Sequence, residues 1–161
     1  MKNKYLSLLF ASFLIVSGCE TIGGSSSSSD SPSYAYGDSK QANLQGYLQN
    51  EIGDRVYFET NKHNINSAAA FTLEAQANWL NSTPGFQIII EGHCDERGTR
   101  EYNLALGERR ANSVKEFLVS LGVDPGRIST ISYGKERPAA EGSTSESWAE
   151  NRRSVTIVGS E

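Results

Sequence analysis

The chain has 161 residues and a formal net charge of −4 at neutral pH, and 37% of its residues are hydrophobic. This length suffices for one domain with a real core and leaves little room for a second. A mildly acidic chain without a polybasic stripe gives no electrostatic basis for binding nucleic acid, and two cysteines are too few for a disulfide framework. We therefore expect one domain that is stabilised by packing.

The first 18 residues have the pattern of a secretory signal. Lys2 and Lys4 precede an apolar run over 6–16, which is too short to span a bilayer. The tetrapeptide Val16-Ser17-Gly18-Cys19 resembles the lipobox of bacterial lipoproteins, in which cleavage before the cysteine leaves it as a lipid-modified N-terminus. We therefore predict a lipoprotein signal peptide over 1–18 and lipidation of Cys19. The alternative is an incidental cysteine near an ordinary cleavage site.

Residues 19–52 are predicted to be the lipidated N-terminus and a flexible tether. Glu20 follows the cysteine; in the lipoproteins that this segment resembles, Asp at that position favours the inner membrane, so Glu20 favours the outer membrane. Two glycines and the serine run over 25–29 make the stretch up to Lys40 too poor in aliphatic residues to form a core. The spacing of Leu44, Leu48 and Ile52 predicts a short helical lead-in over 41–51. The folded domain is expected over 53–161.

Strands and helices are predicted to alternate along this domain. Strands are expected over 56–58, 86–91, 128–133 and 153–158, long helices over 65–80 and 99–121, and a short helix after a possible capping box at 143–146. The three isoleucines at 88–90 suit a strand covered on both faces. The order β-α-β-α-β-(α)-β predicts a two-layer α+β fold, with a mixed four-stranded sheet and the two long helices on one face.

Charged side chains gather where the second predicted strand ends. His93, Asp95, Glu96 and Arg97 follow an apolar run, as is typical of a buried strand that surfaces at a functional site. If the strand continues that far, Asp95 and Cys94 point to opposite sides. The second long helix is expected to bury the stripe Leu104, Ala111, Val114, Leu118 and Leu121, and to carry Asn103, Leu106 and Arg110 on the adjoining flank.

Asp95 and Arg110 suggest a site for a zwitterion. A carboxylate can take an ammonium group, and a guanidinium on the next helix can take a carboxylate bidentately. The spacing fits the alternative better, in which Asp95 and Arg110 pair with each other or with their neighbours. Spacing alone therefore leaves the zwitterion site as a hypothesis.

The segment EGHCDERGTREYNLALGERR at 91–110, with ISYGKERP and NRRSVTI further on, closely resembles the peptidoglycan-associated lipoproteins of the OmpA-like C-terminal domain family. The resemblance covers roughly residues 55–158. It implies an outer-membrane lipoprotein that binds the peptidoglycan stem peptide without catalysis or cofactor and recognises meso-diaminopimelate. In that family, the Asp of GHxD and the second Arg of ERRA clasp the amino and carboxylate groups; the matching residues are Asp95 and Arg110. TolB and other Tol-Pal components are the implied partners, and cell division the implied setting.

The resemblance implies further contacts from the loop after the first strand, the start of the second helix and the arginine of the last motif. The matching residues are the backbone around Thr60, Asn61 and Lys62, then Asn103, Leu106 and Arg152. The loop commonly reads FDFDK, so this chain lacks an acid where Asn61 stands. If the loop acts through backbone N–H groups, the change is tolerable; if through a carboxylate, affinity falls. Cys94 stands where Ala is frequent and is expected to be a small buried residue.

Catalytic and metal-binding alternatives fit the sequence poorly. Zinc needs three or four ligands with one focus, whereas His93 and Cys94 are adjacent and diverge on a strand. A thiol nucleophile would need His63 brought to Cys94, and Asp95 and Glu96 are neighbours that diverge. We therefore expect that the protein is not an enzyme and has no metal site. A wall-binding lipoprotein of another envelope complex, such as a secretion system, is the second hypothesis, and a peptidoglycan hydrolase is the third.

Overall fold

The computed structural model describes residues 34–159, and the predicted signal peptide, Cys19 and the first part of the tether lie outside the described residues. Helix α1 (Tyr34–Tyr47) begins the described chain and continues into a π-helical turn, η1 (Leu48–Ile52). In residues 34–159, none of the helices combines the length and the apolar character needed to cross a membrane.

The α1 helix is longer than the lead-in expected over 41–51, and it is attached to the domain. Leu48 is fully buried in the core. The side chain of Gln41 donates to the carbonyl oxygen of Val158 at 2.7 Å, and the Val158 amide donates to the Gln45 side chain at 2.7 Å. Over residues 34–52 the structure therefore differs from the flexible tether expected over 19–52, because Leu48 packs in the core and two glutamines bind Val158 at the end of the last strand.

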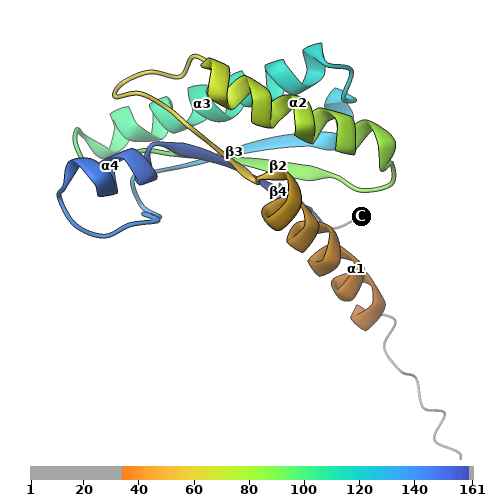
Figure 1. Ribbon diagram of the computed structural model, residues 1–161. Coiled ribbons are helices and arrows are strands. Elements are labelled where there is room, and N and C mark those ends of the chain that lie inside the picture. Colours follow the sequence, from red (N-terminus) through yellow and green to blue (C-terminus); the bar gives the residue numbers. More distant parts are fainter. Residues whose placement is uncertain (1–33, 160–161) are drawn as a thin grey trace, which may run out of the picture. The chain divides into compact units, whose positions relative to one another are not determined.

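Four strands form one mixed sheet in the spatial order β1-β4-β2-β3 (Figure 1). The outer strand β1 (Arg55–Tyr57) pairs antiparallel with β4 (Arg153–Val158), which pairs antiparallel with β2 (Ile88–His93). β2 pairs in parallel with β3 (Ile128–Gly134), and parallel neighbours need a crossover, which α3 (Arg100–Ser120) provides. The predicted mixed four-stranded sheet is confirmed.

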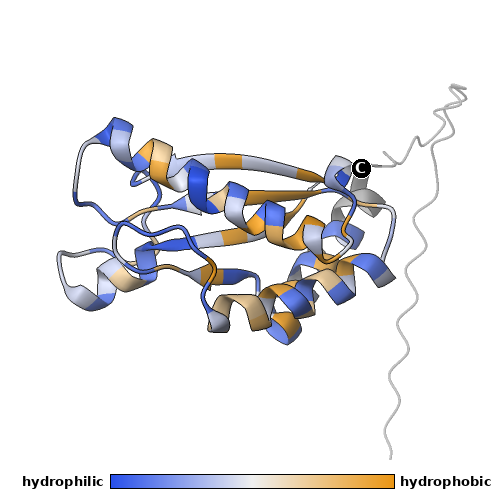
Figure 2. Cartoon of the chain, turned by 90° about the horizontal axis from the view of Figure 1, so that it is seen from above, coloured by the Kyte–Doolittle hydropathy of each residue, from blue (hydrophilic) through white to orange (hydrophobic). Residues whose placement is uncertain are grey.

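The helices α2 (Ser67–Ser82) and α3 cover one face of this sheet (Figure 1), as predicted. Ile88 and Ile90 are fully buried beneath them, whereas Ile89 is 37% exposed on the opposite face. The expectation that β2 is covered on both faces is therefore wrong: burial alternates along the strand because only one face carries the long helices. In Figure 2 the loops at the end of the domain that carries α4 (Ser145–Asn151) are mostly hydrophilic.

Side-chain caps set where the helices begin, and this is why the sequence located them well. The Asn66 side chain accepts from the Ala69 amide at the start of α2, and Thr99 accepts from the Tyr102 amide at the start of α3. Thr144 and Ser147 form a reciprocal capping box that begins α4, one residue later than the box expected at 143–146. A short 3-10 turn, η2 (Pro125–Arg127), leads into β3.

The buried stripe of α3 agrees with the one expected at Ala111, Val114 and Leu118 and differs at the other two positions. Leu104 and Leu121 are 41% and 37% exposed, whereas Leu106 and Arg110 are buried. The cause is a backbone crossing, because a Cβ atom placed on Gly92 of β2 would lie 1.9 Å from the Gly107 carbonyl oxygen of α3. This contact between two glycines presses the first half of α3 onto the end of β2 and turns the flank that bears Arg110 into the core.

Replacing Gly92 by alanine should destabilise the domain. The new methyl group would meet backbone rather than a movable side chain, so we expect a loss of about 3 kcal/mol in the free energy of unfolding, measured by urea denaturation. Gly46→Ala is the matched control, since its Cβ meets nothing within 4 Å in α1. That variant should be unchanged or more stable by about 0.5–1 kcal/mol. Equal stability of the two variants would contradict the crossing.

Candidate binding site

Segments that are distant in the sequence meet at the end of the sheet that carries α4 (Figure 1). β2 ends there at His93, the loop from β1 to α2 passes it, α3 begins at Arg100 and α4 ends at Asn151. The residues predicted from the sequence lie on these segments. Hydrogen bonds among them, described next, bring the predicted acid, the predicted loop and two of the predicted arginines into one cluster.

Asp95 is a nearly buried carboxylate bound by arginines. Its side chain is 9% exposed. Arg97 donates to both oxygens, from Nη2 to Oδ2 at 2.7 Å and from Nε to Oδ1 at 3.1 Å, and Arg152 Nη1 lies 3.5 Å from Oδ2. Burial alone would raise the pKa of the Asp95 carboxyl, but the hydrogen bonds from Arg97 and Arg152 outweigh it and hold this pKa below its usual value. Asp95 is therefore ionised at neutral pH.

Arg110 is fully buried, with an exposed fraction of 0%. Its guanidinium donates to three backbone carbonyl oxygens: Lys62 at 2.9 Å, Glu59 at 3.1 Å and His93 at 2.7 Å. Burial lowers the pKa of Arg110. Arg110 was expected at the edge of the core and open to a ligand; in the structure it lies within the core and clamps the loop after β1 to the end of β2.

Asp95 and Arg110 do not pair with each other. Within residues 34–159, the ion pairs of Asp95 are made with Arg97 and Arg152. The alternative in which Asp95 pairs with its neighbours is therefore what the structure shows. The two predicted residues nevertheless belong to one cluster, because Arg152 also donates to the Phe58 carbonyl oxygen at 3.0 Å, and Phe58 adjoins the loop that Arg110 holds.

The 59–62 turn presents carbonyl groups to Arg110. It is closed by a hydrogen bond from the Lys62 amide to the Glu59 carbonyl oxygen at 3.1 Å. Asn61 has a φ of 57°, in the left-handed region that Asn and Asp tolerate better than most residues. The Thr60 hydroxyl accepts from Arg97 Nη2 at 3.3 Å. The Asn61 side chain is exposed at the tip of the turn, so the backbone conformation explains an Asn at this position.

Asn103 and Leu106 support the cluster from the buried side of α3. Asn103 is 2% exposed and donates from its side chain to the Arg97 carbonyl oxygen at 2.8 Å. Leu106 is 3% exposed. Both were expected to line a groove, but in the structure they fix the backbone of the loop and fill the core.

Cys94 lies beside Arg110, just after the end of β2, so the strand does not continue as far as the predicted opposition of Cys94 and Asp95 required. The register of β2 shifts between Gly92 and His93, so strict alternation ends there. The Cys94 thiol donates to the Asn103 carbonyl oxygen at 3.3 Å and lies 3.5 Å from Arg110 Nη1. It is buried, as expected, and burial raises the pKa of this thiol, which disfavours a thiolate nucleophile.

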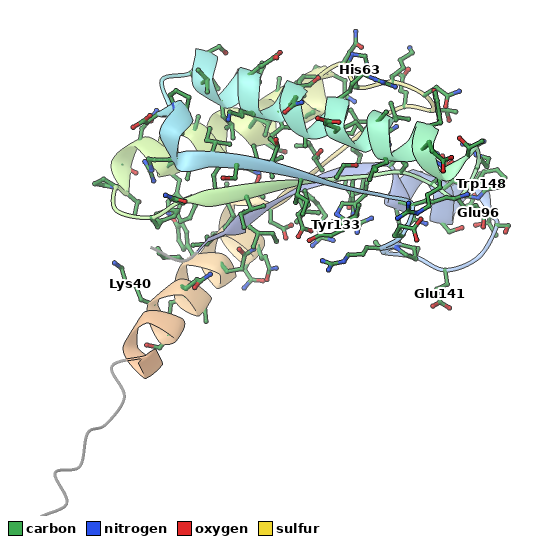
Figure 3. All side chains as sticks on the ribbon, turned by 180° about the vertical axis from the view of Figure 1, so that it is seen from behind. Lys40, His63, Glu96, Tyr133, Glu141 and Trp148 are labelled. Atoms are coloured by element: carbon green, nitrogen blue, oxygen red, sulfur yellow. The ribbon has the colours of Figure 1, made fainter. Side chains whose placement is uncertain are left out.

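His93 is buried near the end of β2, and His63 lies apart from Cys94. Burial and the charges of Arg153 and Arg137 lower the pKa of His93 to about 4, so its contact with Glu91 is a hydrogen bond of a neutral ring. His63 lies on the loop beside the helical layer (Figure 3) and is not a partner of Cys94. The part of the chain from 34 to 159 contains no group of three or more His, Cys, Asp or Glu residues placed to hold a metal ion.

Arg97 and Trp148 belong to the cluster; the sequence placed Arg97 in the charged segment without giving it a ligand contact, and Trp148 was not predicted to lie there. The Arg97 guanidinium lies over the Trp148 ring, 4.2 Å from its centroid. The indole N–H donates to Glu96 at 2.9 Å, and Figure 3 shows Glu96 and Trp148 side by side at this end of the domain. A tryptophan in the short polar helix SESWAEN was the available signal, because a helix of that composition has no core of its own to bury the ring.

A groove opens beside the cluster, with a volume of about 330 Å³. Arg152 links the two, because it lines the groove and also reaches Asp95. The other lining residues come from the end of β1, the following loop and α4: Tyr57, Phe58, Glu59, Asn66, Ala149 and Glu150.

Comparison with known proteins places this geometry in a family. The model of the OmpA family matches residues 57–152, a range that contains the whole cluster. The chain belongs to the OmpA family. Within it, the chain is 44% identical to the peptidoglycan-associated lipoprotein of Mesorhizobium japonicum over 98% of this chain and 92% of that protein, and 41% identical to that of Pseudomonas aeruginosa over 94% of each.

A solved OmpA-family structure agrees with the sequence relatives. The crystal structure of the peptidoglycan-associated lipoprotein from Burkholderia pseudomallei is similar with a TM-score of 0.66 and 38% identity, over 70% of this chain and 99% of that one. The predicted resemblance to this branch of the OmpA family is therefore confirmed.

Replacing Arg110 by leucine should destabilise the domain. Leucine fills part of the space but takes the guanidinium donors away from the carbonyl groups of Glu59, Lys62 and His93, so we expect a loss of about 3 kcal/mol in the free energy of unfolding. Urea denaturation measures it. The control is Arg109→Leu, next in sequence but exposed, which should change stability by no more than about 0.5 kcal/mol. A similar loss in both variants would mean that Arg110 is not a clamp.

Proposed function

We propose that this chain is an outer-membrane lipoprotein that binds peptidoglycan without catalysis and attaches the outer membrane to the cell wall. The observation that carries the proposal is the ionised Asp95 among three guanidinium groups, at the end of a domain whose relatives are named peptidoglycan-associated lipoproteins. A zwitterion whose carboxylate lies near its ammonium group matches this mixture of charges.

The ligand in this proposal is the stem peptide, recognised at meso-diaminopimelate. Asp95 takes the ammonium group. Arg110 is the family's counterpart for the carboxylate, but it is enclosed, so a carboxylate reaches it only if the 59–62 turn moves aside. Arg152 has a side chain 15% exposed at the groove, and a carboxylate can reach it without that movement. Thr60, Asn61 and Lys62 form the turn at the edge of the proposed site. Asn103 and Leu106 support the site by fixing the loop that carries Asp95 and by packing in the core.

Attachment in this proposal depends on two contacts. Acyl chains on Cys19 hold the outer membrane, and the domain holds the wall. Confinement near the wall raises the effective concentration of stem peptides, and many copies act together, so weak individual binding suffices. TolB and the other Tol-Pal components are the proposed partners, with a role in envelope constriction at division. The protonated Cys94 thiol and the neutral His93 support a non-catalytic role.

Replacing Asp95 by asparagine should strongly weaken binding to the wall. Asparagine keeps the shape and removes the charge that holds the ammonium, and losing one partner of a desolvated charge pair weakens affinity by about tenfold or more. Co-sedimentation with purified peptidoglycan measures this. Glu108→Gln, an exposed acid on α3, is the control and should sediment like the original chain.

Three results would contradict parts of this proposal. Undiminished co-sedimentation of the Asp95→Asn protein would overturn the site. A pull-down in which TolB fails to associate would favour a wall-binding lipoprotein of another envelope complex. A change in the muropeptide profile of peptidoglycan after incubation with the chain would overturn the non-catalytic role.

A further inference from the structure

In this structure the Asp95 carboxylate already holds a cation, the guanidinium of Arg97. Arg97 engages both carboxylate oxygens with its side chain, and its own amide donates to Oδ1 at 3.2 Å. The Arg97 side chain is 41% exposed, whereas that of Asp95 is 9% exposed. The guanidinium of Arg97 therefore lies between the carboxylate and the solvent.

We propose that Arg97 is an internal competitor of the ligand: its guanidinium occupies the ammonium position of Asp95 and must leave before a stem peptide can bind. This inference rests on the proposed function and names the residue that regulates its site. The ring of Trp148 is the surface that retains the guanidinium after it leaves Asp95.

Arg97 is the arginine of the cluster that is free to move. Arg110 is fixed by three carbonyl groups, and Arg152 makes one long contact with Asp95 while its Nε is bound to the Phe58 carbonyl. Arg97 makes its remaining contacts with the Thr60 hydroxyl and the face of Trp148. Its guanidinium can thus exchange Asp95 for solvent without breaking any bond to the backbone of another segment.

The backbone around Arg97 is fixed, so the exchange needs only a side-chain rotation. Asn103 holds the Arg97 carbonyl, and Lys135 Nζ donates to the carbonyl oxygens of Glu96 at 3.1 Å and Gly98 at 2.8 Å. The Trp148 ring is held by its hydrogen bond to Glu96. A fixed loop and a fixed ring leave one movable group, and side-chain rotations of exposed residues are fast compared with loop rearrangements.

Competition by Arg97 predicts the direction in which the affinity changes when its guanidinium is removed. Every ligand that binds must first break the pair between Arg97 and Asp95, so this pair lowers the apparent affinity by the fraction of molecules in which Asp95 is uncovered. Removing the guanidinium removes that cost. A residue that served the ligand directly would show the opposite effect, because its loss would weaken binding.

The test compares Arg97→Gln with Arg100→Gln in the full-length chain purified in detergent. Arg100 is a matched control, since it is a nearby exposed arginine that pairs with Glu136 and does not contact Asp95. Calorimetric titration with a soluble muropeptide ending in meso-diaminopimelate measures affinity. We expect the Arg97→Gln protein to bind at least about threefold more tightly and the Arg100→Gln protein to bind like the original chain.

The pH dependence of binding gives a second readout that a purely structural arginine would not change. Removing Arg97 takes away hydrogen bonds that lower the pKa of Asp95, so this pKa rises toward its usual value. Binding needs ionised Asp95, and in the variant it should therefore be lost at a higher pH on acidification than in the original chain. Asp95 interacts electrostatically or by hydrogen bonds with five groups around it. These are Glu96 and Arg97 in its own loop, Cys94, Arg110 of α3 and Arg152 after α4.

The outcomes separate the inference from the function on which it rests. Suppose that the original chain binds the muropeptide and the Asp95→Asn protein does not. The role of Arg97 as a competitor is then overturned, and the proposed function kept, if the Arg97→Gln protein binds equally or more weakly, or if it loses binding at the same pH as the original chain on acidification. If the original chain fails to bind the muropeptide, or Asp95→Asn binds as well as it does, the proposed function is overturned and the competitor with it.

Discussion

The burial of the Arg110 guanidinium is the constraint on which the end of this domain depends. Within residues 34–159 no carboxylate pairs with it, and its charge is stabilised by three backbone carbonyl groups. A buried cation is costly unless its donors are satisfied, and here they are satisfied only when the turn after β1, the end of β2 and α3 are all in place. One side chain therefore makes the shape of the loop depend on the packing of the core.

The charges around Asp95 follow from that arrangement. Arg110 holds the turn, and the turn and α4 place Arg97 and Arg152 against the carboxylate. Three guanidinium groups surround the one partly desolvated acid, while Glu59 and Glu150 line the adjoining groove. The two signs of charge therefore lie side by side at this end of the domain, which favours ligands that carry both.

Local patterns predicted the fold well, and contacts across the fold were the ones missed. Asn66 and Thr99 cap their helices through amides three residues away, so the sequence contained the whole interaction. The burial of Arg110 was missed because a helical projection does not show that α3 crosses β2 at Gly107. The Arg97 stack on Trp148 joins two loop-proximal residues far apart in the chain, and no spacing rule reports such a pair.

The docking of α1 on Val158 changes the mechanics expected of the anchor. A tether over 19–52 would be a long flexible linker. With α1 docked on Val158 through Gln41 and Gln45, residues 34–52 no longer add their full extended length to the reach of the domain. Tension from the N-terminal side would therefore act on a docked helix, whose contacts include those of Gln41 and Gln45 with Val158.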